Sequence, residues 1–252
     1  MKEPSGELVE LDFYFSDRTD VDALRDISMH CIKNGGKYSG ELLVSHHENA
    51  RTHKFQNIYS SKVRVIEVSD SRLMDTLNDG NTRVVKVPIY LALGIIKKRP
   101  EIVTYNPVSD KASGKDYHPV AIVSEGWEFS TPGYELQAKK AGNLCYEKLK
   151  AVCTDLNPDY AAILNENSLP SPHDLEPETA DYYFSDFYVC SSAYGTNTIS
   201  KIEAMYDDSY LERLPGGIYV SSYHVYNPKR ITIDRRNTNR RSRKVAALLK
   251  KT

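Results

Sequence analysis

The sequence predicts an α+β protein with mixed or antiparallel sheets, packed helices and two lobes. Runs of β-branched and aromatic residues are mixed irregularly with helical patterns, without the regular strand–helix alternation of a parallel doubly wound sheet. A hydrophobic fraction of 40% and a charged fraction of 27% over 252 residues are typical of an ordinary globular protein. The composition therefore argues against a disordered chain.

The first half of the chain opens with an expected strand at 8–15, where apolar and acidic residues alternate. Thr19 and Asp22 have capping-box spacing and predict the start of a helix, and Gly35 with Gly36 predicts its end. Alternation and β-branching predict further strands, with one short helix at 71–77 between them. The strands are expected at 41–44, 63–68, 82–87, 102–105 and 120–123.

The longest helix is expected to begin at Thr131 and Pro132, an N-cap residue followed by a residue suited to the first helical position. It is expected to end near Asn157. After it, two prolines at 170 and 172 predict a rigid loop, since neither fits inside a helix or a central strand. Strands are expected at 160–164, 187–190 and 218–221, with helices from about 198 and within 240–251.

Charge is distributed unevenly although the whole chain has a net charge of −1. Residues 1–154 are balanced, residues 155–226 carry a net −10, and residues 227–252 carry a net +9. We therefore predict a balanced lobe at 1–154, an acidic tyrosine-rich lobe at 155–234 and a basic tail at 235–252. The asymmetry predicts that function lies in the second half of the chain.

The acidic lobe is the first candidate site. Tyrosines are interleaved with its carboxylates, and the whole chain has 18 Tyr against 6 Phe. Tyrosine suits binding surfaces, and acidic groups speed encounter with basic partners. The alternative is a solvated acidic face over a tyrosine-rich core. The predicted partner-binding residues are Asp174, Glu176, Glu178, Asp181, Asp186, Tyr206, Asp207, Asp208, Tyr210 and Glu212.

The basic tail is the second candidate site. Paired cations can contact phosphates, which predicts salt-dependent binding of nucleic acid. Two alternatives remain open: the tail packs on the acidic lobe of its own chain, or it is a free solubilising arm. The candidate nucleic-acid-binding residues are Arg235, Arg236, Arg240, Arg241, Arg243 and Lys244.

Catalytic and metal-binding patterns are weak. His118, Glu125 and Glu128 are the nearest approach to an acid–base group and support an enzyme only as a third hypothesis. The histidines at 46, 47 and 53 lack metal-ligand spacing, and the four cysteines contain no CxxC pair, so they are expected to be buried thiols. Phosphate-binding glycine loops are also absent, and no cofactor is predicted.

Three segments of the second half resemble immunity proteins of bacterial polymorphic toxin systems. They are Tyr160-Ala161-Ala162-Ile163, Leu169-Pro170-Ser171-Pro172 and the run Leu214 to Ser221. The resemblance implies a cytoplasmic, non-enzymatic protein that neutralises a toxin by binding it. No apolar run reaches membrane-spanning length and the N-terminus has no signal-peptide core, so we expect a cytoplasmic protein with a basic protein partner and no membrane partner.

Overall fold

The computed structural model describes residues 7–44, 64–78, 84–91, 101–105, 119–129, 132–165, 168–181, 183–221 and 235–251. The strands are β1 (Leu8–Tyr14), β2 (Gly36–Tyr38), β3 (Glu41–Val44), β4 (Arg64–Glu67), β5 (Val84–Leu91), β6 (Glu101–Tyr105), β7 (Val120–Glu125), β8 (Tyr160–Asn165), β9 (Asp186–Cys190), β10 (Leu211–Leu214) and β11 (Gly217–Ser221). The helices are α1 (Asp20–Lys33), α2 (Asp70–Asn78), α3 (Glu135–Leu156), α4 (Ser191–Glu203) and α5 (Arg235–Leu249), with short 3-10 turns η2 (Trp127–Phe129) and η3 (Asp208–Tyr210).

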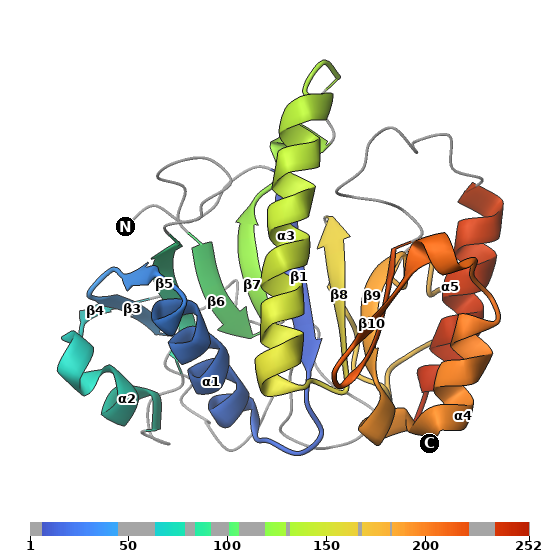
Figure 1. Ribbon diagram of the computed structural model, residues 1–252. Helices are drawn as coiled ribbons and strands as arrows, with labels where there is room; N and C mark the ends of the chain where they lie inside the picture. The colour runs from blue at the N-terminus through green and yellow to red at the C-terminus, as the bar shows by residue number, and fades with distance from the viewer. Residues whose placement is uncertain are drawn as a thin grey trace.

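One sheet of eleven strands organises these elements (Figure 1). Its order is β10-β11-β9-β8-β1-β7-β6-β5-β3-β4, with β2 pairing to β5, and every pairing is antiparallel. The α+β fold class is confirmed. The predicted boundary at 154/155 lies in the last turn of α3, and β1 joins the two sides of that boundary by pairing with both β7 and β8.

The first helix follows its sequence signals closely. The Thr19 hydroxyl accepts a hydrogen bond from the backbone N–H of Asp22 at 3.1 Å. Helix α1 begins at Asp20, the residue after Thr19. Gly35, just beyond the helix, has φ +92°, the left-handed conformation that glycine adopts easily. Both predicted ends of this helix are confirmed.

The start of α3 differs from its prediction. The helix begins at Glu135, because Gly133 has φ +88° and breaks helical geometry after Pro132. It ends as expected, with Asn157 in the left-handed region at φ +51°. Its 22 residues span roughly 33 Å, and its first turns extend beyond the sheet (Figure 1).

Three smaller differences concern the second half and the short strands. Helix α4 starts at Ser191, before the predicted 198, and includes a kink where Gly195 has φ +77°. Strands β2 and β10 were not predicted, because β2 has only three residues and the Leu-Glu-Arg-Leu of β10 does not alternate. All four cysteines are buried and free, as expected.

The two faces of the sheet carry different layers. On one face, Tyr146 of α3 packs against Tyr219 of β11, with ring centroids 4.9 Å apart. On the other face, Tyr14 stacks on Tyr160 and the ring of Phe184 meets Tyr160 edge-on. Side chains of successive strand residues point to opposite faces of the sheet, so Tyr160 lies on the face opposite α3. Pro170 and Phe184 both contact Tyr160, so the described residues of 168–184 cover that face. Helices α4 and α5 lie side by side at the β10 end of the sheet (Figure 1).

Candidate binding surfaces

The structure removes two residues from the predicted partner-binding set. Asp186 is completely buried in β9, where its carboxylate accepts hydrogen bonds from the hydroxyls of Ser221 and Tyr219. Tyr206 is 7% exposed and its ring packs near Phe187. Neither can form part of a docking surface, so the prediction is corrected for both. Strand alternation and apolar packing direct these side chains inward despite their polar groups.

Three further residues of that set are bound within the chain. Asp174 accepts a hydrogen bond from the Ser171 hydroxyl at 3.2 Å. Asp181 accepts two hydrogen bonds from the guanidinium of Arg243, at 2.6 and 2.9 Å, which lower the pKa of its carboxyl. These hydrogen bonds fix the orientation of both carboxylates within the chain.

Glu212 of β10 is the third of these residues, and it is bound by α3. Lys150 Nζ donates to it at 2.5 Å, and the Tyr146 hydroxyl donates to its other carboxylate oxygen. Partial burial acts to raise the pKa of Glu212, but these hydrogen bonds and the Lys150 charge lower it on balance. The contact fastens the edge strand β10 to the central helix.

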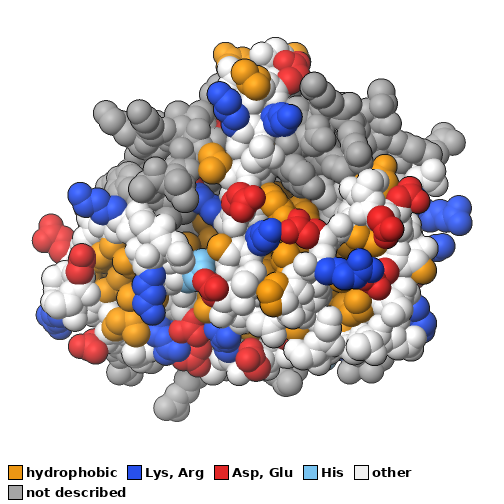
Figure 2. Space-filling view, viewed as in Figure 1, with side chains coloured by type: hydrophobic (Ala, Val, Ile, Leu, Met, Phe, Trp, Pro, Cys, Tyr) orange, Lys and Arg blue, Asp and Glu red, His pale blue; other side chains and the backbone are white. Residues whose placement is uncertain are grey.

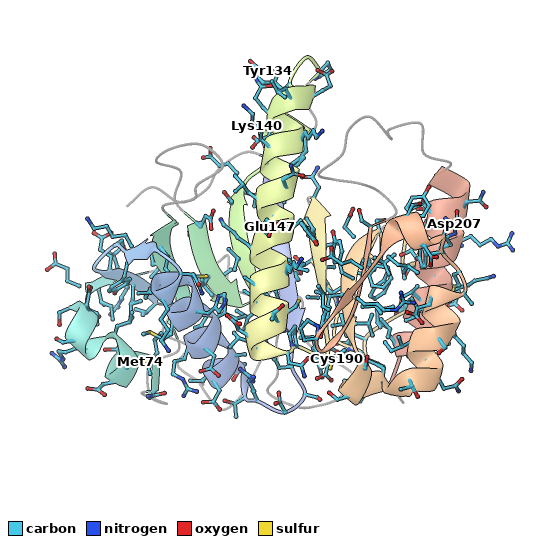
Figure 3. The ribbon with its side chains drawn as sticks, viewed as in Figure 1. Met74, Tyr134, Lys140, Glu147, Cys190 and Asp207 are labelled. Carbon is cyan, nitrogen blue, oxygen red and sulfur yellow. The ribbon has the colours of Figure 1, made fainter. Side chains whose placement is uncertain are left out.

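The remaining predicted acids stay on the surface. Glu176, Glu178, Asp207 and Asp208 are exposed, and Tyr210 is half-buried. We call Asp207, Asp208 and Tyr210 the acidic corner, which lies between the end of α4 and β10; the neighbouring Glu203 and Glu212 are paired with Arg213 and Lys150. Figure 2 shows acidic side chains over this part of the surface with basic side chains among them, and Figure 3 places Asp207 at the outside of the molecule.

The basic tail is a helix that packs on the acidic lobe of its own chain. The buried Ser242 hydroxyl donates to the carbonyl of Ala180 and accepts from the backbone N–H of Phe184 at 3.1 Å. Val245 and Leu249 are completely buried on the same side. For the described residues of the tail, the structure matches self-packing and not a free arm.

The six predicted nucleic-acid-binding residues differ in whether their side chains contact the rest of the chain. Arg241 lies over the ring of Tyr206, with the guanidinium carbon 5.3 Å from the centroid, and Arg243 binds Asp181. Arg240 and Lys244 are exposed. The other two, Arg235 and Arg236, open α5, and their side chains lie outside the described part of the structure.

A groove of about 580 Å³ lies between the acidic loop, residues 174–181, and helix α5. Its lining joins the two charged segments that the sequence singles out. The loop provides Pro177 and Glu178, and the helix provides Asn239, Arg240, Arg243, Lys244 and Ala247.

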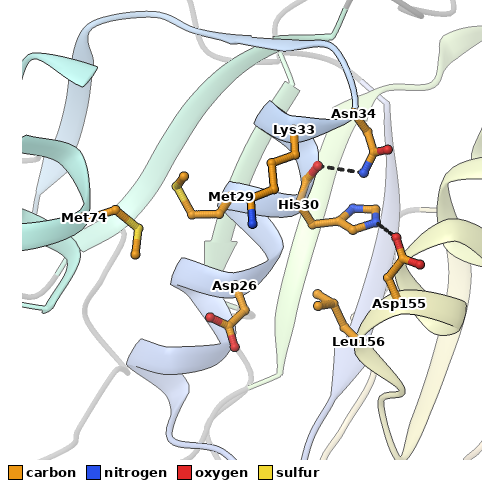
Figure 4. A pocket seen from close by; sticks show the side chains of 8 residues that line it. All are labelled: Asp26, Met29, His30, Lys33, Asn34, Met74, Asp155 and Leu156. Carbon is orange, nitrogen blue, oxygen red and sulfur yellow. Dashed lines mark hydrogen bonds and ion pairs between the residues drawn. The ribbon is translucent and has the colours of Figure 1, made fainter. Parts of the chain in front are cut away.

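A second cavity, of about 500 Å³, lies between α1, α2 and the end of α3 (Figure 4). His30 Nε2 is 2.9 Å from a carboxylate oxygen of Asp155, which fixes the orientation of the imidazole. The ammonium of Lys33 points into the cavity, and Met29 and Met74 form an apolar wall (Figure 4). The described lining residues include no hydroxyl or thiol that the imidazole could activate. Sequence reasoning missed this pair because 125 residues separate its members.

The predicted acid–base group is only partly described. Glu125 is half-buried at the end of β7, and Glu128 is 1% exposed in η2. His118 and the histidines at 46, 47 and 53 lie outside the described residues. No group of His, Cys, Asp or Glu that could hold a metal ion occurs in the part of the chain that the structure describes.

A buried ion pair lies between α3 and the sheet. Lys148 of α3 donates to Glu101 of β6, whose side chain is 3% exposed. Burial raises the pKa of Glu101, and Lys148 acts against this shift. Burial is also the main cause that raises the pKa values of the Cys31 and Cys145 thiols to about 12. Such thiols are unreactive at neutral pH.

No protein-family model, curated protein or solved structure matches this chain. Within the described ranges, none of the helices has the length and apolar character needed to cross a membrane.

Proposed function

We propose that this protein is a cytoplasmic, non-enzymatic binding protein whose acidic corner docks a basic protein partner. The exposure of Asp207 and Asp208, in the turn between α4 and β10, carries the proposal. Among the described residues, neither carboxylate takes part in an ion pair. Their negative charge is therefore available to attract and orient a cationic partner.

Strand β10 supports the same surface. It is the last strand at its end of the sheet and pairs only with β11 among the described strands. The outer backbone groups of an edge strand can bind an extended segment of another chain. Half-buried Tyr210 adds an aromatic contact beside the two carboxylates. An extended segment rich in Lys and Arg has the shape and charge that this surface accommodates.

The resemblance of the second half to immunity proteins suggests the class of partner. Two of the three resembling segments contribute to this half of the sheet, at β8 and at the β10–β11 turn. Under the proposal, the partner is a basic toxin, and the protein neutralises it by covering its surface. Catalysis has no part in this function.

The test uses the full chain with Asp207→Lys and Asp208→Lys together. Used as bait in lysate of the native host, the wild type should retain a basic protein in stoichiometric amount. Titration calorimetry with that protein, once purified, should show affinity at least about tenfold weaker for the variant, equal to about 1.4 kcal/mol. Both side chains are exposed, so the fold should be unaffected.

A matched control reverses two exposed acids elsewhere, Glu67→Lys in β4 and Asp75→Lys in α2. This control changes net charge by the same amount and should bind like the wild type. Equal weakening in both variants would show that total charge, and not the acidic corner, governs binding. A neutral or acidic stoichiometric partner would also contradict the proposal.

A further inference from the structure

We propose that the groove between the acidic loop and α5 is a second binding site, which holds the phosphate backbone of double-stranded nucleic acid without reading its sequence. The site is separate from the acidic corner, and its ligand has the opposite charge to the partner proposed above. It uses the part of the basic tail that internal packing leaves unpaired.

The helical pattern of α5 separates its packing side from its cationic side. Thr238, Ser242 and Leu249 are buried and face the core. At 100° per residue, Arg240 and Lys244 lie on the opposite side, about 6 Å apart along the axis. Both are exposed, and the described structure contains no ion pair to either. These two cations are therefore available to an external anion.

The other charges near the groove limit the expected strength. Arg243 lines the groove but is held by Asp181, and Glu178 lies on the opposite wall. The groove therefore provides two phosphate contacts, from Arg240 and Lys244. A site with two phosphate contacts binds weakly, and its affinity falls modestly as salt increases.

Two observations favour a duplex backbone over other anions. The cations follow one another along an exposed helix, as contacts to a polymeric anion do. None of the described lining residues is aromatic, so the groove offers no platform for stacking unpaired bases.

The test measures fluorescence anisotropy of a labelled duplex of mixed sequence, about 20 base pairs long, over a range of NaCl concentrations. Two phosphate contacts predict a slope of about −1.8 in log K against log salt, so affinity should fall roughly tenfold between about 50 and 200 mM. Arg240→Gln with Lys244→Gln should remove most of the salt dependence. The substitutions leave the Ser242 and Leu249 contacts of α5 intact, and a thermal melt checks the fold.

Lys139→Gln with Lys140→Gln in α3 is the matched control and should keep the wild-type slope. Three results would overturn the proposal. They are an unchanged slope in the Arg240 and Lys244 variant, equal competition by polyglutamate, or tighter binding of a single strand than of the duplex. None of these results bears on binding of a basic protein at the acidic corner, so the two proposals fail independently.

Discussion

Two acidic segments of the same lobe have different surroundings in the folded chain. In the acidic loop, Asp181 is bound by Arg243, and the neighbouring Ala180 carbonyl accepts from Ser242. At the acidic corner, Asp207 and Asp208 are exposed without an ion pair in the described structure. The basic helix α5 accounts for the difference, because it folds back on the loop.

The comparison shows that charge along a sequence is a poor guide to a binding site until the internal pairs are known. Residues 155–226 and 227–252 have net charges of −10 and +9, and these nearly compensate. Part of that compensation is physical contact, including Lys251 Nζ to Asp159 at 3.0 Å. Only the carboxylates outside such contacts can attract a partner.

The largest expected effect concerns the attachment of α5 itself. Leu249 is completely buried, so Leu249→Ala should lower the free energy of unfolding by about 2–5 kcal/mol through lost burial and a new cavity. Urea unfolding followed by circular dichroism measures the change. Ala247→Ser, on the exposed side of the helix, is the control and should change stability by less than about 0.5 kcal/mol. A loss this small for Leu249→Ala would mean that α5 is a loosely attached tail.

A smaller effect is expected at the hydrogen bonds that join α5 to the acidic loop. Ser242→Ala leaves the Phe184 N–H without its acceptor and the Ala180 carbonyl without its donor. All three residues are completely buried, so unfolding free energy should fall by about 1–3 kcal/mol. Ser242→Thr, which keeps the hydroxyl, should recover part of the loss in the same urea experiment. Wild-type stability in Ser242→Ala would show that these bonds do not hold the helix.

Local signals predicted local structure well. Thr19 and Asp22 marked the start of α1, and β-branched runs marked most strands, because capping and alternation depend on neighbouring residues. The helix start at Glu135 was missed, since Pro132 fits a first helical turn equally well until the backbone of Gly133 is known.

The candidate sites depend on contacts that no local pattern contains. His30 meets Asp155, and Arg243 meets Asp181, across 125 and 62 residues of sequence. The tyrosine-rich pattern predicts either a binding surface or a tyrosine-rich core, and Tyr206, placed in the predicted binding set, packs inside, because an aromatic ring with a polar tip suits either environment. The segregation of charge was visible in the sequence, but the choice between a free and a packed tail required the fold.

The smallest expected effect compares one carboxylate from each acidic segment. Hydrogen bonds from Arg243 lower the pKa of Asp181 below its ordinary value of 3.8. A lowered pKa stabilises the fold above the unfolded value, and this contribution is lost as pH falls through the folded value. Asp181→Asn should therefore destabilise slightly at neutral pH and approach wild-type stability as the pH falls through the lowered pKa of Asp181, measured by urea unfolding at neutral and at acid pH. Asp207→Asn removes a carboxylate without an ion pair in the described structure, so its unfolding curves should match the wild type at both pH values. Identical stability changes in the two variants would show that the Arg243 contact of α5 does not stabilise the fold through Asp181.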